Sequence, residues 1–211
     1  PAEVKSKYID FLNFTNASKT DIHARYIEWN KKGDSLDNYF VFSFVRNPWD
    51  WMVSQYTFLK KIYIKRLRRE RQGKPAVKDF YIQRRENFSN KLSLFGISFS
   101  DFKANPDCLS FEKYIEAYFS SDDLNKTQLG FIINESSEIA LDFVGKFESL
   151  QDDWNSLCDK INLSPVNLEQ TNASLNRKPY TEYYSSPAIK KIVDDGLKDD
   201  IEHFGYEFGN L

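Results

Sequence analysis

The chain has 211 residues, of which 16% are aromatic, and its net charge at pH 7 is only −2. This length suits one globular domain that buries a sizeable apolar core. The near-balanced charge argues against a general binder of polyanions, and no apolar run approaches the roughly 18 residues of a membrane-spanning helix.

The first predicted elements are a helix and a strand. Asp21 to Lys31 has polar capping residues at its start and Gly33 past its end, which is typical of a helix. Tyr39 to Val45 contains only aromatic residues, valine and serine. Because this run is too short for a free-standing helix and rich in strand formers, it predicts an interior strand.

A long helix is expected next, from about Pro48 to Gln72. Proline is tolerated in the first turn of a helix, and Gly73 ends it. The apolar residues that recur every three or four positions, and so predict one buried face, are Val53, Tyr56, Leu59, Tyr63 and Leu67.

Arg46 lies between this strand and this helix, where α/β proteins bind anions. Ligands of open α/β sheets bind in the crevice at the carboxyl ends of the strands, close to helix amino termini. The guanidinium fork matches a phosphate, and the hydroxyl of Ser54 joins it if the helix begins late or bends back. The alternative is a plain core strand and a surface helix, with Arg46 capping the strand.

The second half of the chain predicts shorter elements. Val77 to Asn105 has no clean periodicity, and we interpret it as a lid or an acceptor-binding insertion. A helix is expected from Phe111 to Phe119, and a second interior strand from Ile139 to Phe147.

Two further helices are predicted from their capping residues. Ser149 and Asp152 resemble a capping pair for a helix that ends at Lys160. Pro187 begins a closing helix that ends near His203, where the histidine suits the helix dipole, and Gly205 is the expected left-handed residue.

Eight basic residues lie on the long helix and just after it. They form a solvated face, the common case, or a surface for an anionic acceptor such as an acidic or sulfated glycan. Nucleic acid is the least favoured partner, because few aromatic residues accompany the run and acidic residues elsewhere cancel its charge. The eight are Lys60, Lys61, Lys65, Arg66, Arg68, Arg69, Arg71 and Lys74.

The cysteines and the sequons point to different compartments. Cys108 and Cys158 form no CxxC or metal-ligand spacing, so reduced thiols and a cytoplasmic location are expected. With two histidines in the chain, a protein-built zinc site is not expected. A secretory or Golgi lumen is the alternative, with a leader or anchor upstream of Pro1. It is favoured by seven sequons, at Asn13, Asn16, Asn87, Asn125, Asn134, Asn162 and Asn172.

Four segments in order carry a family resemblance. They are FVRNPWDWMVSQY (44–56), LDFVGKFESL (141–150), NRKPYTEYY (176–184) and DIEHFGYEF (200–208). The first is similar to the 3'-phosphate motif of carbohydrate-type sulfotransferases, F-V-R-[ND]-P-x-[DE]-R-x-V-S-x-Y, and the second to their D-F-[IV]-G-[RK]-F-E-[NS]-L. The chain departs from the first pattern at Trp51, where the family usually has a second arginine.

The resemblance implies a fold and a reaction. The fold is α/β with three layers, a mostly parallel sheet flanked by helices, as in P-loop nucleotide kinases. The reaction is in-line transfer of a sulfuryl group from 3'-phosphoadenosine 5'-phosphosulfate (PAPS) to a hydroxyl acceptor, expected to be a carbohydrate. The product is 3'-phosphoadenosine 5'-phosphate (PAP), and no metal is required.

The resemblance also implies binding residues. Arg46 and Ser54 bind the 3'-phosphate, while Arg177 and Lys178 close over the nucleotide, the alternative being that these two lie in a solvated loop. Gln128 lies in a segment similar to a family loop near the acceptor, which implies substrate binding. Glu148, although it falls in a matching segment, is interpreted as structural.

His23 is the candidate general base. Sulfuryl transfer needs a group that takes the proton from the attacking hydroxyl, and histidine does this at neutral pH. Family members commonly have a histidine at the start of a helix upstream of the 3'-phosphate strand, and His23 has a similar place. The alternative is a histidine on the helix surface, in which case Glu28 and Asp21 are the next candidates.

A loop of the type P-K-[TAS]-[GA]-[GT]-T-S, which holds the 5'-phosphosulfate in the family, is not found in these residues. We expect it upstream of Pro1, since the predicted sheet otherwise lacks its central strand. The alternative is a relative that has lost the loop and binds a nucleotide or glycan without catalysis, because the charge on the transferring group then has no visible stabiliser.

Overall fold

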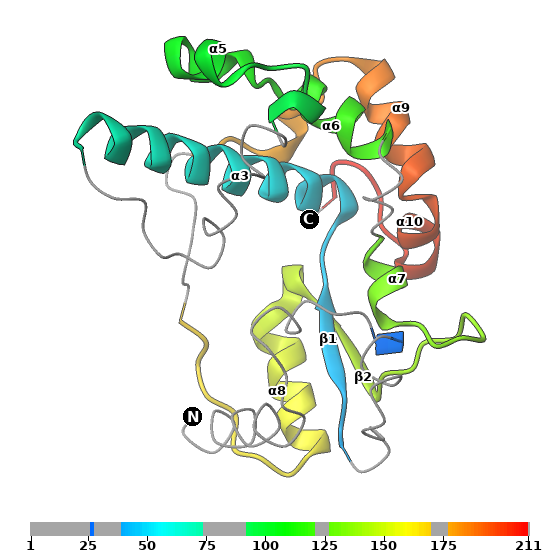
Figure 1. Cartoon of the computed structure of the whole chain (residues 1–211). Helices are drawn as coiled ribbons and strands as arrows, with labels where there is room; N and C mark the ends of the chain where they lie inside the picture. The colour runs from blue at the N-terminus through cyan, green and yellow to red at the C-terminus, as the bar shows by residue number, and fades with distance from the viewer. Residues whose placement is uncertain (1–25, 28–38, 74–91, 121–126, 170–176, 211) are drawn as a thin grey trace. The chain divides into compact units, whose positions relative to one another are not determined.

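The computed structural model describes residues 26–27, 39–73, 92–120, 127–169 and 177–210 (Figure 1). The chain divides into two compact units, one formed by residues 1–47 and 126–173 and the other by residues 48–125 and 174–210. We call them unit 1 and unit 2. Of the predicted helix from Asp21 to Lys31, only Tyr26 and Ile27 are described, and both are helical.

Unit 1 contains a pair of parallel strands. β1 (Phe42–Val45) pairs with β2 (Phe143–Lys146), with Phe42 opposite Phe143 and Val45 opposite Lys146, and Figure 1 shows them side by side. Both predicted strands are therefore confirmed in position, although each is shorter than expected. Within the described residues this sheet has two strands.

The start of β1 is less buried than an interior strand. Val45 is buried, but Phe42 is 39% exposed. β1 has a single neighbouring strand in the described part of the chain, so one of its edges lacks a strand partner there. Ile139, predicted to open the second strand, instead forms an isolated antiparallel bridge with Ile133.

One helix covers the strands of unit 1. α8 (Leu150–Lys160) buries Trp154, Leu157 and Cys158, against which Phe44 and Phe143 pack. Gly145 of β2 makes this packing feasible, because a Cβ there would lie 2.5 Å from Cε1 of Phe44.

The predicted capping pair of α8 is wrong. The chain enters the helix through the 3-10 turn η5 (Phe147–Ser149), so Ser149 is not extended and caps no N–H. Its hydroxyl donates to Asp153 at 3.0 Å, and the same carboxylate accepts the Lys146 N–H. Asp153, rather than Asp152, therefore links the start of the helix to the end of β2.

Unit 2 is helical in the part that the structure describes. Its longest element is α3 (Pro48–Arg71), which confirms the predicted helix. Along it Val53, Tyr56, Tyr63 and Leu67 are buried and Leu59 is partly buried, as the apolar spacing predicted. The remaining elements are α5 (Phe99–Ala104), η3 (Pro106–Cys108), α6 (Phe111–Ser120), η6 (Tyr180–Tyr183), α9 (Pro187–Gly196) and α10 (Lys198–Phe204).

α6 packs against both α3 and α9, around a core rich in aromatic rings. The predicted insertion from Val77 to Asn105 contributes to this core. Its first part lies outside the described residues, whereas Leu92, Ile97 and Phe102 are buried. Its role as a lid or acceptor-binding segment stays a prediction.

The predicted closing helix is two helices. The chain leaves helical geometry at the buried Leu197 (φ −117°, ψ 24°). The ring of Phe119 packs so tightly at the preceding Gly196 that a Cβ there would lie 2.2 Å from the ring. The left-handed residue is confirmed, since Gly205 has φ 64°. No helix in the described ranges is long and apolar enough to span a membrane.

Candidate functional site

The turn that follows β1 is held by Gln128, the first residue of α7 (Gln128–Ile132) in unit 1. The Arg46 N–H donates to Oε1 of Gln128 at 2.8 Å, and Nε2 of Gln128 donates to the Arg46 carbonyl at 2.7 Å. Gln128 is only 8% exposed. Two bonds from one buried amide fix both the position and the orientation of the Arg46 main chain.

The next residue is held by a second side chain. The N–H of the fully buried Asn47 donates to Oε1 of Glu148 at 2.6 Å. Glu148 lies in η5, directly after β2. A hydrogen bond to a charged group is stronger than one between neutral groups, so this contact anchors the turn firmly. The structural interpretation of Glu148 agrees with this contact.

The Arg46 side chain lies over an aromatic ring. Its Cζ is 4.4 Å from the centroid of Phe147, which is 46% exposed. Burial lowers the pKa of Arg46, and the nearby Glu148 carboxylate raises it by less. The guanidinium remains a cation at neutral pH, and its planar fork of donors suits a phosphate, so the residues present fit an anion.

The other predicted binding residues belong to unit 2. Arg177 forms an ion pair with Asp50, and both side chains are largely buried. Asp50 lies in the first turn of α3, where the helix dipole favours a carboxylate. Lys178 is exposed, and its Nζ lies 3.5 Å from Oε2 of Glu182. Ser54 is half-buried on α3.

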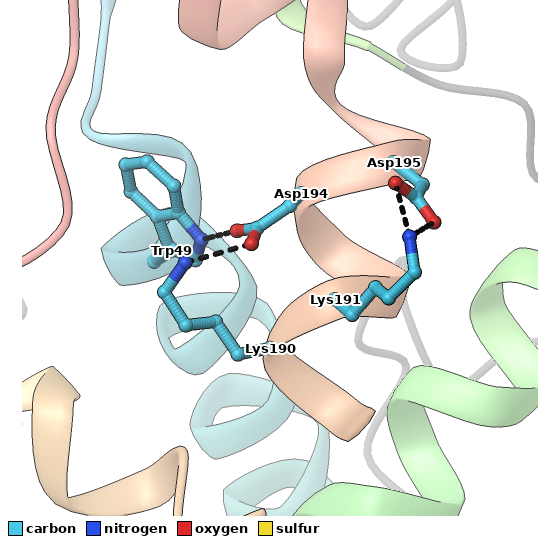
Figure 2. Close-up of polar contacts among 5 residues, drawn as sticks. All are labelled: Trp49, Lys190, Lys191, Asp194 and Asp195. Atoms are coloured by element: carbon cyan, nitrogen blue, oxygen red, sulfur yellow. Dashed lines mark hydrogen bonds and ion pairs between the residues drawn. The ribbon is translucent and has the colours of Figure 1, made fainter. Parts of the chain in front are cut away.

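Trp49, also in unit 2, is anchored to α9 (Figure 2). It is 3% exposed, and its Nε1–H donates to Oδ1 of Asp194 at 2.7 Å. Nζ of Lys190 donates to the other oxygen at 2.7 Å and lies 5.4 Å from the centroid of the Trp49 ring. The Trp49 carbonyl accepts from the Tyr184 hydroxyl at 3.0 Å.

The structure thus joins some predicted residues and leaves others untested. Arg46 and Gln128 are in contact, although Gln128 was predicted to touch the acceptor, and that role stays a prediction. His23, with the runner-up bases Asp21 and Glu28, lies outside the described residues.

Sequence reasoning missed the contacts of Phe147 and Asp194. The available signal for Phe147 was its place in a segment similar to a family pattern. For Asp194 there was no such signal. The Lys–x–x–x–Asp spacing occurs twice in succession on α9, so it does not indicate which aspartate contacts Trp49. The described ranges contain no group of three His, Cys, Asp or Glu side chains that could hold a metal ion.

Comparison with known proteins gives one family. Searches of the curated proteins and of the solved structures returned no match. A sequence model described as "Sulfotransferase family" matches residues 7–207, nearly the whole chain. This match covers the strand and helix around Arg46 and the four segments on which the resemblance rests, apart from Phe208 at the end of the last one. The chain therefore belongs to the sulfotransferase family, and it is a PAPS-dependent transferase with the α/β fold of that family.

Proposed function

We propose that this protein transfers a sulfuryl group from PAPS to a hydroxyl group of a carbohydrate. Family membership supports the donor and the type of reaction. The carbohydrate is proposed from the form of the motif around Arg46, which is similar to that of the carbohydrate-type group. We propose the full three-layer architecture, with a mostly parallel sheet, on the same grounds.

The observation that carries the proposal is the Arg46 turn. A half-buried guanidinium follows a parallel strand directly, and its main chain is fixed by two side chains from elsewhere in unit 1. Such a fork of donors, held in place, is suited to a phosphate. Because the surrounding sequence is similar to the 3'-phosphate motif, we assign Arg46 to the 3'-phosphate of PAPS and of the product PAP.

The remaining roles are proposed from the resemblance. Ser54 is assigned to the 3'-phosphate, and Arg177 and Lys178 to the rest of the nucleotide. Arg177 fulfils this role only if it shares its charge between Asp50 and the nucleotide. Gln128 is assigned to the acceptor side of the site.

PAPS supplies the sulfuryl group. His23 takes the proton from the attacking hydroxyl as its oxygen bonds to sulfur, while the bond from sulfur to the phosphate oxygen breaks and PAP leaves. No metal is needed for this proton transfer. Arg46 binds the 3'-phosphate, which is remote from the reacting sulfur, and so contributes binding energy that positions the donor.

The test is a transfer assay with the full chain encoded by its gene and PAPS that carries labelled sulfate. Neutral, acidic and already sulfated glycans are offered as acceptors, beside small phenols and steroid alcohols. Label on a glycan hydroxyl is the expected result. Label only on the small alcohols overturns the carbohydrate acceptor, and nucleotide binding without transfer to any acceptor overturns catalysis in favour of a binding protein.

A further inference from the structure

The Arg46–Asn47 turn is fixed through its main chain by two side chains that come from separate segments. Gln128 takes both the N–H and the carbonyl of Arg46, and Glu148 takes the N–H of Asn47. Main-chain groups that leave a strand lose their ladder partners, and buried ones require others. These three bonds meet that requirement, and all of them lie within unit 1.

We propose that Gln128 and Glu148 are positioning residues for recognition of the 3'-phosphate. By holding the main chain of Arg46 and Asn47, they keep the Arg46 guanidinium over Phe147 in one orientation. The inference rests on the proposed function, because it assumes that Arg46 binds the 3'-phosphate.

The physical reason is the geometry of the guanidinium. A bidentate contact with a phosphate depends on the direction of the planar fork, which a small rotation of the main chain alters. A binding side chain must be held close to its productive geometry by the residues around it. The cation–π contact with Phe147, at 4.4 Å, orients the far end of the side chain, while Gln128 and Glu148 fix the near end.

Glu148 has two opposing effects on an anion at Arg46. Its bond to Asn47 holds the turn, whereas its negative charge, which raises the pKa of Arg46, competes with a phosphate for the guanidinium. Glu148→Gln removes the charge and keeps an oxygen that can accept from Asn47. Glu148→Met removes both, so the difference between these variants isolates the hydrogen bond.

The chain offers a matched control for Gln128. Gln151, in the same unit, also forms two bonds with main-chain groups, accepting from the Leu168 N–H at 2.8 Å and donating to the Val166 carbonyl at 3.2 Å. It contacts a different segment from Arg46. Gln151→Met therefore shows how the loss of two side-chain bonds to the main chain of unit 1, away from Arg46, affects nucleotide binding.

The experiment measures the dissociation constants of PAP and AMP by calorimetry, and their ratio gives the discrimination for the 3'-phosphate. For Gln128→Met we expect a PAP affinity about 10-fold below that of the wild type, with AMP affinity unchanged. This loss is the equivalent of one hydrogen bond between the misdirected guanidinium and the 3'-phosphate. Gln151→Met is expected to keep the wild-type ratio. Glu148→Gln should bind PAP at least as tightly as the wild type, and Glu148→Met about 10-fold less tightly than Glu148→Gln.

The outcomes separate this inference from the function beneath it. A wild type that binds PAP and AMP equally overturns the assignment of Arg46 itself. A wild type that discriminates, with Gln128→Met discriminating equally well, overturns the inference alone. If Gln128→Met does not fold, the two Glu148 variants decide, and equal PAP affinities for them overturn the positioning role. If Gln151→Met loses the discrimination between PAP and AMP as Gln128→Met does, the positioning role is also overturned, because the loss then does not depend on the contact with Arg46.

Discussion

Arg46 in unit 1 and Trp49 in the first turn of α3 in unit 2 are neighbours in one sequence motif, yet their side chains are held in different ways. The bonds that fix Arg46 go to its main chain, and its side chain lies over a half-exposed ring. The side chain of Trp49 is itself buried and bonded to Asp194, and its carbonyl also accepts from the Tyr184 hydroxyl. The first arrangement suits binding and the second suits packing, so we expect substitutions in the two regions to change different properties.

A second contrast, between a partly buried and an exposed ion pair, lies within α9 (Figure 2). Lys190 with Asp194, and Lys191 with Asp195, are ion pairs of identical composition and spacing. The first pair is partly buried against Trp49, whereas in the second the side chains are 73% and 66% exposed. Context, rather than the pair itself, therefore decides which of them contributes to stability.

The largest effect is expected at Trp49. Trp49→Ala removes a buried ring that packs edge-on against Phe208 at 5.5 Å, and should lower the free energy of unfolding by about 3–5 kcal/mol. Trp49→Phe keeps one aromatic ring but loses the Nε1–H and part of the buried ring volume, so a smaller loss of about 1–3 kcal/mol is expected. Urea denaturation measures both. If Trp49→Ala is as stable as the wild type, Trp49 is not an anchor.

Arg46→Ala should change binding instead of stability. We expect a loss of about 2–4 kcal/mol in the binding of PAP, the range for truncating one partner of a buried charged pair, with little change in unfolding. Arg46→Lys keeps the charge without the fork and should fall between the wild type and alanine. Calorimetry measures the affinities, and an unchanged PAP affinity in Arg46→Ala contradicts the assignment.

His23 belongs to neither region and should affect turnover alone. Loss of a general base lowers the rate by roughly 100-fold, so His23→Ala should reduce kcat by about that factor while PAP affinity stays the same. Initial rates with saturating donor and acceptor measure it in the full chain. Near-normal turnover moves the role to Glu28, Asp21 or another residue.

The smallest effect comes from the two ion pairs. Asp194→Ala removes the acceptor of the Trp49 Nε1–H and should lower the free energy of unfolding by about 1–2 kcal/mol. Asp195→Ala, the same truncation on the same helix, should cause no measurable change. Denaturation curves recorded side by side provide the comparison. Equal losses in the two variants mean that the contact with Trp49 adds nothing.

The sequence predicted the local structure well where local signals decide it. The strand before Arg46, the helix from Pro48 and the left-handed Gly205 follow from strand formers, proline and glycine, and all are observed. The break at Leu197 was missed although Gly196, a poor helix former, directly precedes it, and the structure shows the Phe119 ring of α6 packed against that glycine.

The contacts of the candidate site were harder to predict than its residues. Gln128 is 82 positions from Arg46, and Asp194 is 145 from Trp49, so no local period links them. Arg46 itself was identified from its position between strand and helix. What the sequence lacked was any sign that Gln128 would bond to the Arg46 main chain, or which group the structural Glu148 would contact.

The central claim is that Arg46 recognises the 3'-phosphate while the contacts of Trp49 stabilise the fold. It is tested most directly by measuring the PAP and AMP affinities of Arg46→Ala and Asp194→Ala beside those of the wild type. We predict that Arg46→Ala binds the two nucleotides almost equally, and that Asp194→Ala, although less stable, keeps the wild-type preference for PAP. A preference for PAP that survives in Arg46→Ala, or that disappears in both variants, contradicts the account.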